Sequence, residues 1–144
     1  MSVKNLLFIL CFLPIIGFGQ NVYIPDANFK ANLVGNSNIN TNGDSEIQVS
    51  EASSFTGAIY CNSAGISDLT GIEAFTALDY LSCYSNQLTS LDLSQNTALT
   101  YLNCEDNQLT SLDLSQNYAL DVLYCDDNQL TSLNLNGAVS LGAV

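Results

Sequence analysis

The chain has 144 residues with fourteen acidic side chains against two basic ones, so its formal net charge at pH 7 is −12. It contains no histidine, which removes the most common general base and the imidazole metal ligand. We expect no nucleic-acid partner and no anionic membrane surface as a partner, because binding phosphate requires cationic groups that displace its counterions.

The first segment, residues 1–19, has the features of a secretory signal peptide. Lys4 precedes an apolar run over residues 6–18, and small residues lie near its end. The run contains Pro14 and is shorter than the roughly 20 residues that span a bilayer. We therefore expect cleavage after Gly19 or the next residue, no membrane insertion, and a secreted or cell-surface protein. Cleavage leaves one base and fourteen acids, a net charge of 1 − 14 = −13.

Residues 20–57 are predicted to form a helical segment with one loop. The Pro-Asp pair at 25–26 can start a helix. Phe29 and Leu33 lie four residues apart, on one apolar face of that helix. Gly35 can end it, because glycine is the common residue just past a helix C-terminus.

Oxygen-bearing side chains in residues 40–51 have the spacing of a calcium-binding loop of the EF-hand type. They occupy ligand positions 1, 3, 5, 7, 9 and 12 of such a loop and are Asn40, Asn42, Asp44, Glu46, Gln48 and Glu51. Asparagine replaces aspartate at positions 1 and 3, and Ser45 stands where the turn prefers glycine. We expect weak Ca2+ binding. The alternative is a simple turn between two helices, with Glu51 charging the first turn of the second.

From about residue 58 the chain is periodic. Three near-identical copies of 21 residues have the pattern L-x-x-L-x-C-x-x-N-Q-L-T-S-L-x-L and begin at Leu78, Leu99 and Leu120. A more divergent copy precedes them, with four apolar residues placed 22 residues before their counterparts: Ile59, Cys61, Ile66 and Leu69. A period of this length predicts a solenoid in which each copy forms one coil.

The pattern resembles that of secreted bacterial leucine-rich-repeat proteins of the internalin-like type, with cysteine in place of the leucine at the sixth position. The resemblance covers Ile59 to about Leu135. It implies a leucine-rich-repeat solenoid of the α/β class, mostly β, with about four coils over residues 58–144. The resemblance also implies short parallel strands on a concave face and a helical N-terminal cap formed by residues 20–57.

The end of the repeat pattern predicts an open apolar edge. The pattern degrades from Leu133 onward, and similar proteins continue through further repeats. We therefore expect the chain to be truncated at its C-terminus. An uncapped last coil leaves apolar residues with nothing stacked on them, so we expect self-association there.

Each coil of such a solenoid can bury its apolar edge only against its neighbours. In the segment x-L-x-C-x, leucine and cysteine alternate with variable residues, so we expect a short strand with both pointing inward. An asparagine follows each strand, at Asn86, Asn107 and Asn128. We expect these to form a buried column that satisfies backbone groups of neighbouring coils.

The cysteines occur once per coil at the same strand position, at Cys61, Cys83, Cys104 and Cys125. We expect a column through the core with neighbours about 4.8 Å apart. Parallel side chains do not converge as a disulfide requires, so we interpret the cysteines as small buried hydrophobes. Disulfide pairing in an oxidising compartment is the alternative.

The outward strand positions line the concave face in three columns. These are Ala58, Tyr80, Tyr101 and Val122; Tyr60, Ser82, Asn103 and Tyr124; and Asn62, Tyr84, Glu105 and Asp126. Five of the seven tyrosines lie there, and tyrosine is favoured at recognition surfaces because it offers a rigid ring with a polar tip. Asp106 and Asp127 add negative charge at the edge. The alternative is that the rings only stack across strands and stabilise the sheet.

These columns supply the candidate ligand-binding residues, which are Tyr60, Tyr80, Tyr84, Tyr101, Asn103, Glu105, Tyr124 and Asp126. We expect a recognition module that binds a protein partner through the concave face, as the resemblance implies. The alternative is an adhesive surface whose tyrosines stack on sugar rings. We expect no enzyme activity, because the carboxylates repeat on an open surface and do not form the paired acid and nucleophile of a glycosidase.

Overall fold

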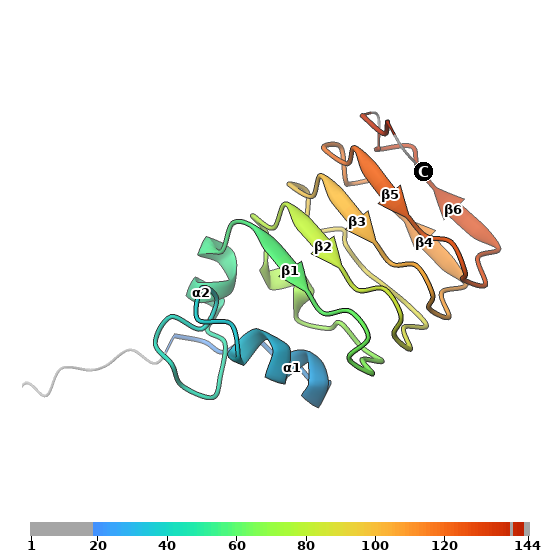
Figure 1. The fold of residues 1–144 in the computed structure, drawn as a ribbon. Coiled ribbons are helices and arrows are strands. Elements are labelled where there is room, and N and C mark those ends of the chain that lie inside the picture. Colours follow the sequence, from blue (N-terminus) through green and yellow to red (C-terminus); the bar gives the residue numbers. More distant parts are fainter. Residues whose placement is uncertain (1–18, 139, 143–144) are drawn as a thin grey trace, which may run out of the picture.

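The computed structural model describes residues 19–138 and 140–142, so nearly all of the predicted signal segment lies outside the described residues. Two α-helices lie at one end of the molecule, and the strands stack away from them toward the C-terminus (Figure 1). The helices are α1 (Ala27–Val34) and α2 (Val49–Ser54). Among the described residues, no helix has the length and hydrophobicity needed to cross a membrane.

The repeats form a leucine-rich-repeat solenoid of about four turns, as predicted. One strand from each coil joins a parallel sheet in the order β1-β2-β3-β5, and these strands are Ala58–Tyr60, Tyr80–Ser82, Tyr101–Asn103 and Val122–Tyr124. The register pairs Ala58 with Tyr80, Tyr80 with Tyr101, and Tyr101 with Val122. The first two predicted outward columns are therefore in register. We call the outer side of this sheet the sheet face.

The opposite side of the solenoid returns the chain from one coil to the next, and we call it the return face. It contains a 3-10 helix, η1 (Ile72–Ala74), in the first coil. The later coils contribute β4 (Ser111–Asp113) and β6 (Ser132–Asn134), which pair in parallel with Leu112 opposite Leu133. Figure 1 shows this second, shorter sheet behind the first.

The core is built from the inward leucine and cysteine positions that the repeat predicted. Leu81, Leu102 and Leu123 are fully buried. The core thins in the last coil, where Cys125 is half-buried and Leu133 is 39 % exposed. Self-association through this last coil stays a prediction.

The four cysteines of the described residues are free thiols, one in each coil. Burial raises the pKa of Cys61 and of Cys104 to about 12. Burial, and then the neighbouring thiols, also raise the pKa of Cys83. The buried thiols are therefore neutral at physiological pH and pack as small hydrophobes.

The predicted asparagine column is present after the sheet strands, but only Asn107 is buried, and Asn86 and Asn128 are half-buried. The Asn107 side-chain amide donates to the carbonyls of Cys83 and Cys104, and its Oδ1 accepts from the backbone N–H of Leu88. Asn86 and Asn128 make the same kind of bonds in the flanking coils. Because each amide joins two coils, the column satisfies buried carbonyls that no strand partner reaches.

A second asparagine column, which the sequence did not predict, lies at the other end of the core. The Asn96 amide donates to the carbonyls of Ile72 and Phe75, and the Asn117 amide donates to those of Leu93 and Asn96. Both side chains are fully buried, and neither Oδ1 has a hydrogen-bond partner among the described residues. This column therefore joins coils through its donors alone.

The N-terminal segment is fastened to the first coil by polar side chains. Asp26 caps α1 as predicted, accepting from the backbone N–H groups of Asn28 and Phe29. Its other oxygen accepts from the backbone and the hydroxyl of Ser67 in the first coil. Asn28 donates to the carbonyl of Gly65, so one side of α1 is tied to the solenoid.

Candidate interaction face

Four tyrosine rings form a continuous strip across the sheet face. Their ring centroids lie 5.2 Å apart from Tyr60 to Tyr80, 4.0 Å from Tyr80 to Tyr101, and 5.9 Å from Tyr101 to Tyr124. The central pair is stacked, with 5° between the ring planes. We call these four residues the tyrosine strip. It crosses all four strands of the sheet.

The strip forms because tyrosine changes column from coil to coil. The central rings, Tyr80 and Tyr101, stand in the first column, and the outer rings stand in the second column. The positions that the rings leave vacant hold the smaller residues Ala58, Ser82, Asn103 and Val122. Ser82 is only 4 % exposed. Small neighbours thus give each outer ring room to lean toward the central pair.

The outer rings are open to solvent, whereas the central rings are half-buried. Tyr60 is 59 % exposed and Tyr124 is 40 % exposed. Burial, and then a hydrogen bond with Tyr101, raise the pKa of Tyr80. Tyr84 in the third column is 39 % exposed. The face therefore combines a fixed aromatic centre with accessible rings around it.

The polar residues predicted beside the rings differ in their availability. Asn103 accepts the backbone N–H of Glu105 through Oδ1 at 3.0 Å. Asn62, one column position considered for hydrogen bonding, accepts from Ser82 Oγ and from the backbone of Tyr84. Asn103 thus uses its side-chain oxygen in the turn that follows its own strand, whereas Asn62 uses its oxygen to bond the next coil.

Glu105 and Asp126 lie in one column, as predicted, just after the ends of β3 and β5. The backbone ladder continues past the strands, because Ser85 N–H donates to the Glu105 carbonyl and Asp106 N–H donates to the Asp126 carbonyl. Asp106 and Asp127 follow in the next column, and both are exposed. We call Glu105, Asp106, Asp126 and Asp127 the carboxylate edge.

The loop at residues 40–51 forms a dense hydrogen-bond network. Glu51 Oε1 accepts from Thr41 and Asn42, and its Oε2 accepts from the Gln48 N–H at 3.0 Å. Burial would raise the pKa of Glu51, but these hydrogen bonds together lower it. This carboxylate caps α2 from inside the loop.

The other predicted calcium ligands are also hydrogen-bonded to one another. Asp44 accepts from Asn42, Gln48 and the backbone of Glu46. Glu46 pairs with Lys30 at 2.7 Å, and Asn40 donates to backbone carbonyls. Among the described residues no cluster of three or more acidic or cysteine side chains is placed to hold a metal ion. The arrangement fits the turn interpretation, and calcium binding stays a prediction.

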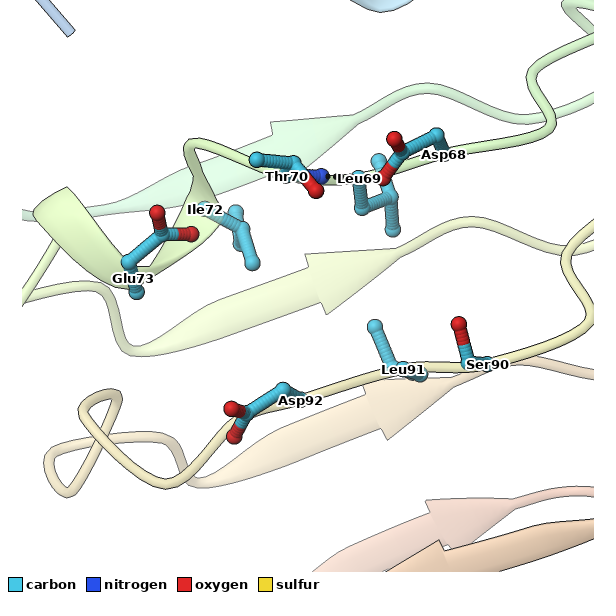
Figure 2. Close-up of a pocket in the computed structure, with 8 residues that line it drawn as sticks. All are labelled: Asp68, Leu69, Thr70, Ile72, Glu73, Ser90, Leu91 and Asp92. Carbon is cyan, nitrogen blue, oxygen red and sulfur yellow. Dashed lines mark hydrogen bonds between the residues drawn. The ribbon is translucent and has the colours of Figure 1, made fainter. Parts of the chain in front are cut away.

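A polar groove lies on the return face between the first two coils (Figure 2). Its carboxylates are Asp68, Glu73 and Asp92. Each accepts a backbone N–H within its own turn, from Thr70, Gly71 and Ser94 respectively. Hydrogen bonds from Ser94 lower the pKa of Asp92. These carboxylates therefore stabilise local turns, and we assign them a structural role.

Comparison with known proteins gives a consistent answer on the fold. No family model matches the chain. Internalin J from Listeria monocytogenes serotype 4b (strain F2365) is 40 % identical over 77 residues, which is 53 % of this chain and 8 % of that protein. The chain thus spans a small part of this relative.

Two solved structures share the architecture. The functional domain of InlJ from Listeria monocytogenes, described as including a cysteine ladder, aligns with a TM-score of 0.76 and 38 % identity over 88 % of this chain and 28 % of that chain. The internalin InlF from L. monocytogenes str. 4b F2365 aligns with a TM-score of 0.66 and 22 % identity, over 83 % of this chain and 42 % of that one. The second likeness concerns the fold alone. The chain is therefore similar, in sequence and in fold, to the leucine-rich-repeat solenoids of internalins.

Proposed function

We propose that this chain is a recognition module of a secreted or cell-surface protein, and that it binds a protein partner through the sheet face. The observation that carries the proposal is the tyrosine strip, which runs unbroken across four coils with its outer rings exposed. The similarity to internalins supports a protein-interaction role.

The energetics of tyrosine favour such a role. Aromatic side chains are enriched among the few interface residues that supply most of the binding free energy. A ring that is already stacked loses little conformational freedom when a partner covers it, so less binding energy is lost to ordering. The stacked pair Tyr80 and Tyr101 therefore provides a preorganised centre for a partner.

The contacts of the sheet face favour a protein over a glycan. A sugar ring needs an open aromatic face and several polar groups aimed at its hydroxyls. Here Tyr80 and Tyr101 cover one face of each other. Asn62 and Asn103 use their side-chain oxygens within the chain. A polypeptide partner does not need free polar groups beside the rings, because it can pack apolar side chains along the tyrosine strip.

Affinity capture tests the proposal. The protein without residues 1–19 is immobilised and used to capture proteins from extracts of neighbouring or host cell surfaces. The captured proteins are identified, and the affinity of the purified partner for this protein is then measured. Replacing the exposed rings by Tyr60→Ala, Tyr84→Ala and Tyr124→Ala should weaken binding by more than tenfold, because hot-spot truncations cost about 2 kcal/mol or more.

A matched control uses the two tyrosines away from the sheet face. Tyr23 is 75 % exposed and Tyr118 is 54 % exposed, so Tyr23→Ala with Tyr118→Ala removes comparable aromatic surface. This control should bind normally. Equal binding by the wild type and the sheet-face variant would show that the partner uses another surface, and binding of glycans alone on an array would favour the adhesive alternative.

A further inference from the structure

The fourteen acidic side chains fall into groups with different hydrogen bonding. Eight accept a hydrogen bond from another side chain or backbone N–H: four in the N-terminal segment and four on the return face. The carboxylate edge differs, since none of its four side chains accepts a hydrogen bond from the described residues. The remaining two, Asp79 and Asp121, lie at the opposite end of the strands.

The fold does not require acidic residues at the carboxylate edge. Asp106 and Asp127 have φ near +50°, a conformation that aspartate tolerates better than most residues. The equivalent residues of the first two coils, Ser63 and Ser85, adopt the same conformation without a charge. Serine therefore satisfies the turn, and the backbone does not explain the aspartates.

The carboxylate edge is instead electrostatically unfavourable in the free protein. Glu105 and Asp126 lie at matching positions of neighbouring coils, just after β3 and β5, as do Asp106 and Asp127. Neighbouring strands are about 4.8 Å apart, and like charges placed directly opposite are destabilising. Within residues 19–138 and 140–142 the one basic side chain, Lys30, pairs with Glu46 in the N-terminal segment. Any basic side chain that compensates these carboxylates would therefore lie outside these residues.

The carboxylate edge adjoins the tyrosine strip on the same face. Tyr124 is two residues before Asp126, and successive outward positions of a strand lie two residues apart. Lysine and arginine suit this arrangement, because their stems pack on apolar rings while their charged heads reach polar groups. Cations are also attracted to the faces of tyrosine rings.

Building on the proposed function, we propose that the sheet face binds a cationic polypeptide segment, with basic side chains of the partner at Glu105, Asp106, Asp126 and Asp127 and their stems along the tyrosine strip. We assign the positive charge to a polypeptide, since no group of three or more acidic or cysteine side chains among the described residues is placed to hold a metal ion.

A pair of charge-matched variants tests this inference with defined probes. The edge variant carries Glu105→Gln, Asp106→Asn, Asp126→Asn and Asp127→Asn. The return-face variant carries Asp68→Asn, Glu73→Gln, Asp92→Asn and Asp113→Asn, and changes the net charge by the same amount. Titration calorimetry measures binding of a short peptide containing several lysines and arginines, and of the same peptide with these replaced by glutamine. Thermal unfolding confirms that each variant is folded.

We expect the wild type to bind the cationic peptide at low salt, and to bind the glutamine peptide at least tenfold more weakly. The edge variant should lose roughly tenfold in affinity for the cationic peptide, while the return-face variant should lose less than twofold. High salt should weaken the wild-type interaction because it screens exposed charges.

Two outcomes would overturn the inference. Equal losses in the two variants would show only a general attraction between a polyanion and a polycation. Absence of wild-type binding at low salt would show that the sheet face does not recognise a cationic segment. The proposed function is tested separately: a captured partner that is lost with the tyrosine variant but retained by the edge variant would support protein recognition and contradict the cationic chemistry.

Discussion

The N-terminal loop and the carboxylate edge use the same chemical group in opposite ways. Glu51 is 8 % exposed, and four hydrogen bonds surround its carboxylate. Glu105 and its three neighbours meet no donor among the described residues, and three of them are exposed. A carboxylate enclosed by N–H groups stabilises the fold, whereas a carboxylate that lacks donors is available to a partner. The following predictions test this difference.

The largest effect should come from Glu51→Ala. The change leaves the N–H groups of Thr41, Asn42 and Gln48 without their acceptor and removes the cap of α2. We expect the free energy of unfolding to fall by roughly 2 to 4 kcal/mol, measured by denaturant titration. Glu105→Ala should change it by less than about 0.5 kcal/mol. Equal losses of stability in Glu51→Ala and Glu105→Ala would contradict the distinction between a structural carboxylate in the loop and an available carboxylate at the edge.

Acidification should produce the next largest effect. Hydrogen bonds outweigh burial and lower the pKa of Glu51 in the folded state. A group with a lowered folded pKa contributes stability above its unfolded pKa, and that contribution is lost as the pH falls through the folded value. Stability should therefore begin to fall near the ordinary pKa of 4.5 and continue to fall below it. Unfolding curves should show a weaker pH dependence in Glu51→Gln, and an unchanged dependence would contradict this assignment.

Calcium should have a smaller effect. To coordinate the ion, Glu51 and Asp44 would have to exchange N–H donors for Ca2+, so binding is expected to be weak, at about 0.1 to 1 mM as in extracellular modules. At about ten times the dissociation constant the gain is near 1.4 kcal/mol. Thermal unfolding with and without calcium measures this gain, and Asp44→Asn should reduce it. If calcium at several times these concentrations does not change the melting temperature, the loop does not bind calcium and is only a hydrogen-bonded turn.

The smallest effect should come from neutralising the carboxylate edge in the absence of a partner. Removing two pairs of opposed like charges should stabilise the protein by a few tenths of a kcal/mol per pair at low salt. The gain should disappear at high salt. The charge-matched return-face variant should show no gain, because its carboxylates accept hydrogen bonds in their turns. A lower melting temperature for the edge variant would indicate a structural role for these residues.

Much of the fold was predictable because every coil faces the same packing problem. The spacing of Leu81, Leu102 and Leu123 determines the register of the sheet, and the repeat predicts the column that contains Asn107. The column of Asn96 and Asn117 was missed because it has no member in the flanking coils, where Phe75 and Ala138 stand at the equivalent positions. Two copies are too few to separate a buried amide from a polar turn residue.

The candidate face was predicted as a set of residues but not as an arrangement. The repeat placed Tyr60, Tyr80, Tyr101 and Tyr124 on the sheet face, as observed. It did not predict that rings from two columns would form one strip, because that depends on how side chains lean over small neighbours such as Ser82. The use of Asn103 within its own turn was also missed, since spacing alone does not show which side-chain oxygens are occupied.

The most direct test of recognition by the sheet face is hydroxyl-radical footprinting of the tyrosines with and without the captured partner. We expect the partner to protect Tyr60, Tyr84 and Tyr124 from oxidation, and to leave Tyr23 and Tyr118 as reactive as in the free protein. Protection of Tyr23 or Tyr118, with the sheet-face tyrosines unchanged, would contradict the account and would place the partner on another surface.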